Sequence, residues 1–214
     1  MNDGTTLHIS FLQKGEIMLE FYELTEDEIS DYSLRKYGYI DHFSFLVDDL
    51  ESAIYRLTKN GAEKINAENE IPKNDQKSQM VRGIYGEKLL IIESNDSAVG
   101  NYAFADVGVA YFRNKQEIVN SYRKMGFEFV ENQGDSRIFY LRFKNISMKY
   151  FWEPEEVYKL RNDGYFDHIA FEIKRIDDAY REVKSEGFPI IEDAPVELPF
   201  WEKGIKYFNF RGPS

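Results

Sequence analysis

Apolar residues recur along this sequence with two periodicities, one typical of strands and one typical of helices. Three short runs either are dominated by apolar residues or alternate apolar with polar ones, as strands do. They span 42–47, 107–112 and 168–173. After each run, apolar residues recur three and four positions apart, which is the spacing of one helix face. We therefore expect helices over 49–60 and 175–186, and a third around Ile118 and Tyr122.

Residues typical of helix ends bracket these segments. Asp49 and Asn114 stand where an N-cap side chain is needed. Gly61, Gly126 and Gly187 stand where a helix ends in a left-handed residue. Each glycine leads directly into another strand-like run, AEKI, FEFV or FPII, and in two of the copies two further strands follow.

The strand and helix pattern is an internal repeat. Residues 38–65 align with 164–191 without a gap, at an offset of 168 − 42 = 126. The residues shared by the two copies are Gly38, Tyr39, Asp41, His42, Phe45, Ala53 and Gly61. A weaker third copy occupies 105–130, at an offset of 126 − 61 = 65 from the first. A repeat of this kind decides the fold.

The repeat divides the chain into four units, of which the outer two are incomplete. Residues 5–24 read as the closing hairpin of unit 1, and 38–94 and 105–153 as the complete units 2 and 3. Residues 164–214 read as unit 4 without its last strand. We expect an α+β fold in which repeated β-α-β-β-β units pair into cupped mixed sheets, incomplete at both ends.

The connections between units suggest how they pair. The linkers 25–37 and 154–163 share a basic middle, Leu34-Arg35 and Leu160-Arg161. The larger repeat is then unit 1 with unit 2, followed by unit 3 with unit 4. This predicts two domains, 1–98 and 99–214.

Composition excludes several classes of function. The net charge is −11 and no Lys/Arg-rich run occurs, which argues against binding to nucleic acid or to an anionic membrane. No apolar stretch approaches the roughly 20 residues that span a bilayer, and the N-terminus has no signal-peptide pattern. We expect a cytoplasmic protein. The absence of cysteine excludes disulfides and thiol chemistry.

The repeated unit, which opens with DHFSF or DHIAF and closes with a glycine turn into an apolar strand ending in Glu, resembles the vicinal oxygen chelate superfamily of glyoxalases, bleomycin-resistance proteins and dioxygenases. The resemblance implies a cupped sheet around a pocket. It also implies a divalent metal (Zn, Fe, Mn or Ni) held by His and Glu from the first and last strands of each unit. Such ligands leave open positions for the adjacent oxygens of a substrate.

The ligand positions that the resemblance implies are only partly filled. The first-strand position falls on His42 in unit 2 and His168 in unit 4, but on Val107 in unit 3. The last-strand position falls on Glu20 in unit 1. In unit 2 it falls on Leu90. In unit 3 it falls on Tyr150, or on Lys149 if the register slips by one residue.

Several functions remain open on this basis. The first is a protein that binds a small organic molecule in a sheet-lined cup whose metal site is degenerate. The alternative is a metal-dependent lyase, isomerase or dioxygenase that uses Glu20 and His42, with Glu20 as ligand or catalytic base. A third is a structural or regulatory relative without a ligand, in which both histidines and Glu20 are ordinary strand residues. We expect units 3 and 4, which offer only His168, to bind no divalent metal.

The two incomplete ends predict open sheet edges, beside the hairpin 5–24 and at 205–211. Open edges pair with other strands. A homodimer is therefore expected, with a monomer frayed at its C-terminus as the competing state.

Overall fold

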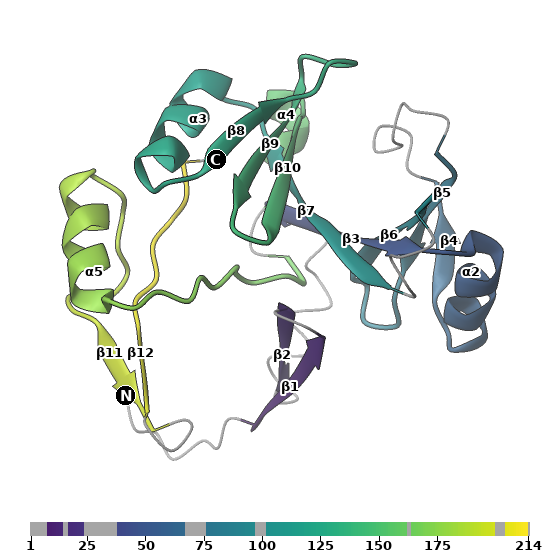
Figure 1. The fold of residues 1–214 in the computed structure, drawn as a ribbon, viewed down its shortest axis with the longest axis horizontal. Coiled ribbons are helices and arrows are strands. Elements are labelled where there is room, and N and C mark those ends of the chain that lie inside the picture. Colours follow the sequence, from purple (N-terminus) through teal and green to yellow (C-terminus); the bar gives the residue numbers. More distant parts are fainter. Residues whose placement is uncertain are drawn as a thin grey trace.

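The computed structural model describes residues 8–14, 17–23, 38–66, 76–96, 102–161, 164–199 and 204–213. Its centre is one mixed sheet of eight strands in the order β4-β5-β6-β3-β7-β10-β9-β8 (Figure 1). Unit 2 supplies β3 (Ile40–Val47), β4 (Glu63–Ile65), β5 (Ser78–Arg82) and β6 (Lys88–Glu93). Unit 3 supplies β7 (Ala103–Tyr111), β8 (Glu128–Glu131), β9 (Ile138–Phe143) and β10 (Ile146–Trp152).

Both complete units have the expected β-α-β-β-β topology. Within each one the first strand pairs in parallel with the last, β3 with β6 and β7 with β10. The helices of the repeat are α2 (Leu50–Lys59), α3 (Lys115–Lys124) and α5 (Ile176–Ser185). The expected helices over 49–60 and 175–186 are thus confirmed, and α2 and α5 are related by the offset of 126.

The helix ends behave as their residues predict. The Asp49 side chain accepts a hydrogen bond from the backbone N–H of Ser52, and Asn114 accepts one from Gln116. The three glycines that follow the helices have φ between 83° and 98°, in the left-handed region: Gly61, Gly126 and Gly187.

The pairing of units differs from the expectation. The antiparallel contact between β3 and β7 joins unit 2 to unit 3 in one sheet, where the linkers had suggested unit 1 with 2 and unit 3 with 4. Within its own unit, each first strand pairs with the last strand along one edge only. The other edge has backbone groups that still need partners, and the first strands of units 2 and 3 provide them for each other. The sheet therefore continues across the predicted domain boundary between residues 98 and 99.

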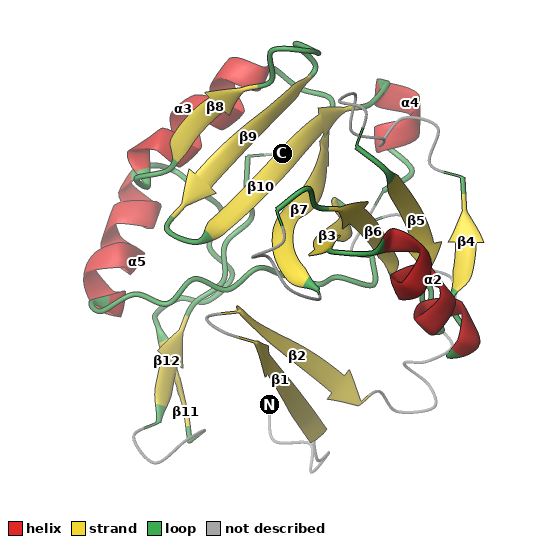
Figure 2. Ribbon diagram, turned by 45° about the vertical axis from the view of Figure 1, so that its right-hand side comes forward, coloured by secondary structure: helices red, strands yellow, loops and turns green. Residues whose placement is uncertain are grey.

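The repeat helices pack against strands of their own units, α2 against β4, β5 and β6 and α3 against β8 (Figure 2). In unit 2, α2 buries Ala53 and Ile54 against Val47 and Ile91. In unit 3 the core is largely aromatic, and the rings of Phe139 and Tyr150 stack with centroids 4.9 Å apart. Among the described residues, no helix is both long and apolar enough to cross a membrane.

The outer units form smaller elements. The hairpin expected in unit 1 is β1 (His8–Lys14) with β2 (Ile17–Glu23). In unit 4, β11 (Val196–Leu198) pairs with β12 (Ile205–Tyr207), next to a single bridge between Ile190 and Phe210. A short helix, α4 (Glu155–Tyr158), follows β10.

The strand expected at 168–173 does not form. This segment has no regular secondary structure and leads into α5, with Ile169 and Phe171 packed against the core of unit 3. Its counterpart in unit 2 is a strand because it has partners on both sides, and the described residues give 168–173 neither partner.

Candidate functional site

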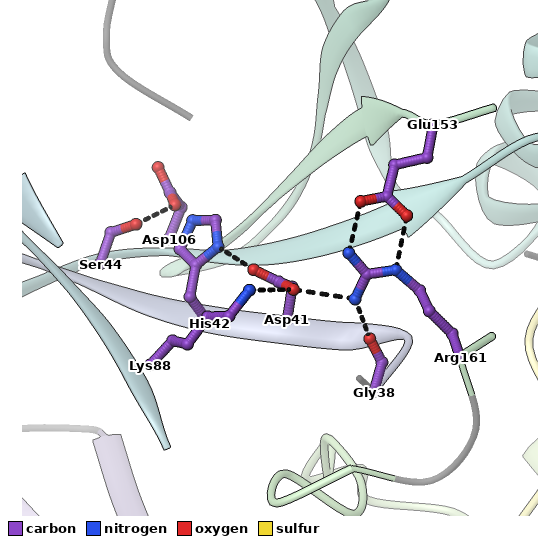
Figure 3. A network of polar contacts seen from close by, with 8 residues as sticks. All are labelled: Gly38, Asp41, His42, Ser44, Lys88, Asp106, Glu153 and Arg161. Atoms are coloured by element: carbon purple, nitrogen blue, oxygen red, sulfur yellow. Dashed lines mark hydrogen bonds and ion pairs between the residues drawn. The ribbon is translucent and has the colours of Figure 1, made fainter. Parts of the chain in front are cut away.

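His42 lies at the start of β3 in a buried network of charged groups (Figure 3). Its Nδ1 atom is 3.1 Å from Oδ2 of Asp41. The other oxygen of Asp41 lies 2.9 Å from Nζ of Lys88 and 2.8 Å from Nη1 of Arg161. Burial alone raises the pKa of Asp41, but the hydrogen bond and charge of His42, with the charges of Lys88 and Arg161, hold it well below its usual range.

Arg161 joins this network to the chain that follows unit 3. Its Nε and Nη2 atoms each lie 2.6 Å from a carboxylate oxygen of Glu153, in a bidentate pair. Nη1 also donates to the carbonyl oxygen of Gly38. Burial lowers the pKa of Arg161, but the bonds to Glu153 and the charge of Asp41 outweigh it and the net shift is upward. The network therefore fastens unit 2 to unit 3.

The place of Arg161 in this network was not predicted from the sequence. The signal for it was the basic middle shared by the two linkers, Leu34-Arg35 and Leu160-Arg161. Arg35 lies outside the described residues.

The imidazole of His42 has no exposed surface. It lies against Gly108 on β7, where an added Cβ would be 2.1 to 2.5 Å from three ring atoms, and it stacks on Phe151 with centroids 6.0 Å apart. A cavity beside Asp41 and Lys88 measures about 10 Å³, which holds at most one water molecule. These surroundings suit a structural histidine.

The register between β3 and β7 corrects the first-strand position in unit 3. His42 pairs with Gly108, and Ser44 pairs with Asp106. If 64 is added to the number of each unit 2 residue, His42 corresponds to Asp106 and Ser44 corresponds to Gly108, and the two pairs become equivalent. The counterpart of His42 in unit 3 is therefore Asp106. Val107, expected from an offset of 65, points into the helix-covered core instead. The helix α3 aligns with α2 at an offset of 65, whereas the strand β7 aligns with β3 at an offset of 64. This one-residue shift was not visible in the sequence repeat.

The last-strand position in unit 3 is Lys149. In unit 2, Leu90 pairs with Ser44. The counterpart of Ser44 in unit 3 is Gly108, which pairs with Lys149. Of the two alternatives left open, the slipped register is therefore correct, and Tyr150 lies in the aromatic core.

The sheet formed by units 2 and 3 does not fit a divalent metal at the ligand positions that the resemblance implies. Its four ligand positions hold His42, Leu90, Asp106 and Lys149. Leu90 has no donor atom, and the ammonium of Lys149, which is buried, repels a cation. Asp106 instead accepts a hydrogen bond of 2.6 Å from the Ser44 hydroxyl.

A second group of polar side chains forms where β2 meets the segment before α5. Nε2 of His168 lies 4.0 Å from Oε2 of Glu20, although the two residues are 168 − 20 = 148 positions apart. Nδ1 of His168 lies 3.0 Å from Oδ2 of Asp167, which repeats the geometry of Asp41 and His42. The Tyr22 hydroxyl donates to Oε2 of Glu20 over 2.9 Å.

This second group is open to solvent. The side chains of His168 and Glu20 are 36% and 28% exposed. The Tyr22 ring lies edge-on to the His168 ring, with centroids 6.4 Å apart. Within the described residues, the polar partners of Glu20 are Tyr22 and His168, not His42.

The surroundings of this group raise the pKa values of His168 and Tyr22. The hydrogen bond with Asp167 raises the pKa of His168, and the carboxylate charges of Asp167 and Glu20 add to it against the opposing effect of burial. Burial, the hydrogen bond to Glu20 and nearby carboxylate charge raise the pKa of Tyr22. His168 therefore keeps its proton to a higher pH than a free histidine, and Tyr22 remains a donor.

The fit of this group to a metal is partial. A metal-binding histidine usually donates one ring N–H to a carboxylate, which orients the ring so that its other nitrogen faces the metal. Structural and catalytic sites use three or four protein ligands. The described residues contain no group of three or more His, Cys, Asp or Glu side chains that could hold a metal ion.

Comparison with known proteins supports the fold. No family model matches the sequence, and no curated protein sequence matches it. Glyoxalase I from Zea mays is similar in structure, with a TM-score of 0.59 and 13% identity over 96% of this chain and 75% of that chain. Methylmalonyl-CoA epimerase from Mycobacterium tuberculosis matches 57% of this chain and 94% of its own, with 12% identity and a TM-score of 0.42. The match to glyoxalase I confirms the expected fold: this chain has a glyoxalase I-like α+β fold.

Proposed function

We propose that this protein binds a small organic molecule at Glu20, Tyr22 and His168. The observation that carries the proposal is the meeting of Glu20 with His168, which brings an acceptor and a donor from distant parts of the chain to one solvent-open place. The buried His42 has no such access.

The geometry indicates what kind of ligand fits. A separation of 4.0 Å is too long for a hydrogen bond, but one oxygen atom can bridge it. A ligand hydroxyl would donate to Glu20 and accept from His168. Phe11 is cross-strand from Glu20 and is 39% exposed, so it offers an apolar surface beside the polar pair. A hydroxyl group on a small aromatic or aliphatic body matches both features.

A metal-dependent lyase, isomerase or dioxygenase is the second candidate. It is favoured by the contact of Asp167 with Nδ1 of His168, because a carboxylate in this place commonly orients a histidine that binds a metal through Nε2. Glu20 and His168, rather than Glu20 and His42, would then hold the metal. A bound metal would supply a Lewis acid for adjacent substrate oxygens.

Thermal shift measurements with separate probes test both candidates. The organic probes are benzyl alcohol and lactate, which carry a hydroxyl group, and the metal probes are Zn²⁺ and Mn²⁺. We expect an organic probe to raise the melting temperature of the wild type without added metal. Glu20→Gln and His168→Ala should abolish that rise.

Glu23→Gln is the matched control. Glu23 lies three residues from Glu20 on β2 and so points to the opposite face, and its change should leave the rise intact. A rise with Zn²⁺ or Mn²⁺ alone that His168→Ala removes would favour the metal-dependent enzyme. An equal response of the wild type and His168→Ala to every probe would contradict both candidates.

A further inference from the structure

The group around His168 carries an excess of negative charge. Within the described residues, the charges that shift the pKa of His168 are the carboxylates of Asp167 and Glu20. Their oxygens lie 3.0 Å from Nδ1 and 4.0 Å from Nε2 of the imidazole. Tyr22 adds no charge, because its raised pKa keeps the phenol protonated. Even when His168 is protonated, one negative charge is therefore left uncompensated.

One oxygen atom of Glu20 is available to a ligand. Oε2 accepts the hydrogen bond of the Tyr22 hydroxyl and is the oxygen that faces Nε2 of His168. Within the described residues, no group donates a hydrogen bond to Oε1 of Glu20. A carboxylate accepts hydrogen bonds on both of its oxygens. Because the Glu20 side chain is 28% exposed, a ligand can reach Oε1 with a donor of its own.

Aromatic rings flank the same carboxylate. Phe11 lies directly opposite Glu20 in the hairpin of β1 and β2, and Tyr22 lies two residues further along β2 on the same face. Phe11 and Tyr22 are 39% and 40% exposed. The face of an aromatic ring attracts an organic cation. Uncompensated negative charge and exposed aromatic surface therefore coincide at Glu20.

We propose that the ligand of this site is an amine, namely an amino alcohol whose hydroxyl and ammonium groups stand on adjacent carbon atoms. This inference rests on the proposed function and adds the charge and the second polar group of the ligand. The hydroxyl bridges Oε2 of Glu20 and Nε2 of His168, while the ammonium donates to Oε1 of Glu20. The two donors stand on adjacent carbons because the two acceptor oxygens belong to one carboxylate.

Charge decides between this ligand and other small hydroxyl compounds. A hydroxy acid would bring a further carboxylate to Glu20 and Asp167, and like charges repel. A neutral diol can make the same hydrogen bonds, but hydrogen bonds between two charged groups are stronger. A divalent metal is held by three or four protein ligands, whereas an ammonium needs only acceptors and a ring. The net charge of −11 also favours the approach of a cation.

Isothermal titration calorimetry with three matched compounds tests the inference. Phenylethanolamine, styrene glycol and mandelate share a phenyl ring and a hydroxyl group on the carbon next to it. On the adjacent carbon they carry an ammonium, a neutral hydroxyl and a carboxylate, respectively. We expect the wild type to bind phenylethanolamine about tenfold more tightly than styrene glycol at neutral pH. Mandelate should bind more weakly than either.

Two substitutions locate the cause of this preference. Glu20→Gln should reduce the preference for phenylethanolamine over styrene glycol from about tenfold to less than about twofold. Glu23→Gln, on the opposite face of β2, is the control and should leave the preference intact. Phe11→Leu keeps an apolar side chain but removes the ring, so it should weaken phenylethanolamine by about two- to fivefold more than styrene glycol. Because this change leaves the polar pair in place, it tests the cation independently of Glu20.

The outcomes separate this inference from the proposed function. Styrene glycol or mandelate bound as tightly as phenylethanolamine, with that binding lost in His168→Ala, would overturn the amine and leave the proposed function standing. A preference for the amine that Glu20→Gln and Glu23→Gln leave equally intact would also overturn the inference. A folded wild type that binds none of the three compounds would contradict the inference and the proposed function together.

Discussion

At the scale of single residues, the repeated Asp-His pair takes two different roles. In unit 2, Asp41 and His42 are buried and joined to Lys88 and Arg161. In unit 4, the same pair at 167–168 is exposed and faces Glu20. The hydrogen bond within the pair is conserved in geometry, so the surroundings decide whether the histidine is structural or available to a ligand.

Gly108 illustrates how tightly His42 is enclosed. Gly108→Ala would place a Cβ 2.1 to 2.5 Å from the His42 ring, and the ring could move only by losing its bond to Asp41. We expect a loss of about 2–3 kcal/mol in the free energy of unfolding, measured by urea denaturation. Gly134→Ala is the control, because its Cβ would meet only Asn132, at 3.4 Å. Equal effects of the two changes would contradict the packing described for His42.

Ionisation of Asp41 should make the free energy of unfolding depend on pH in the acid range. Its pKa is held well below the unfolded value, which is about 3.9, so its contribution is fully present above that pH and is lost as pH falls toward the folded pKa. Asp41→Asn removes the charge that Lys88 and Arg161 share, and should cost about 3–5 kcal/mol at neutral pH. Urea denaturation at several pH values should show the difference from wild type shrinking below about pH 4. A difference that stays constant with pH would be inconsistent with a charged Asp41.

At the scale of elements, α5 lacks an N-terminal feature that α2 and α3 have. Asp49 and Asn114 cap their helices through side-chain oxygens. The corresponding residue of α5, Arg175, makes no such bond and pairs instead with Asp178 at the surface.

Arg175→Ser should therefore stabilise the protein by about 0.5–1 kcal/mol, because a serine hydroxyl can accept from a free N–H of the first turn. Arg175→Ala is the control, since it removes the same ion pair without adding a cap. Chemical denaturation compares the two variants. A serine variant no more stable than the alanine variant would show that this helix end needs no cap.

Elements with local signals were predictable and their partners were not. The spacing of Leu50, Ala53 and Ile54 identified α2, and Gly61 marked its end, because both depend on residues within one or two turns. The meeting of Glu20 with His168 depends on a side-chain contact between segments 148 positions apart. The one-residue shift between β7 and α3 is likewise visible only in the register, so Asp106 and Lys149 were missed or left open as ligand positions.

At the scale of the whole molecule, charge opposes the association of two copies. Each chain carries a net charge of −11, and repulsion between two such bodies is screened by salt. A homodimer formed through the open sheet edges should therefore be tighter in high NaCl than in low NaCl when measured by sedimentation equilibrium. A dimer that dissociates on addition of salt would indicate an interface held by ion pairs rather than by paired strand edges.

The most direct test of the binding site is the titration of His168 by NMR. The chain has only three histidines, so their imidazole signals can be assigned by substitution. The pKa of His168 should lie above the ordinary value of about 6.5, because of the hydrogen bond to Asp167 and the charges of Asp167 and Glu20. Asp167→Asn and Glu20→Gln should each lower it, while Glu23→Gln should not. If Glu20→Gln leaves that pKa unchanged, Glu20 and His168 do not meet in solution and the proposed site is wrong.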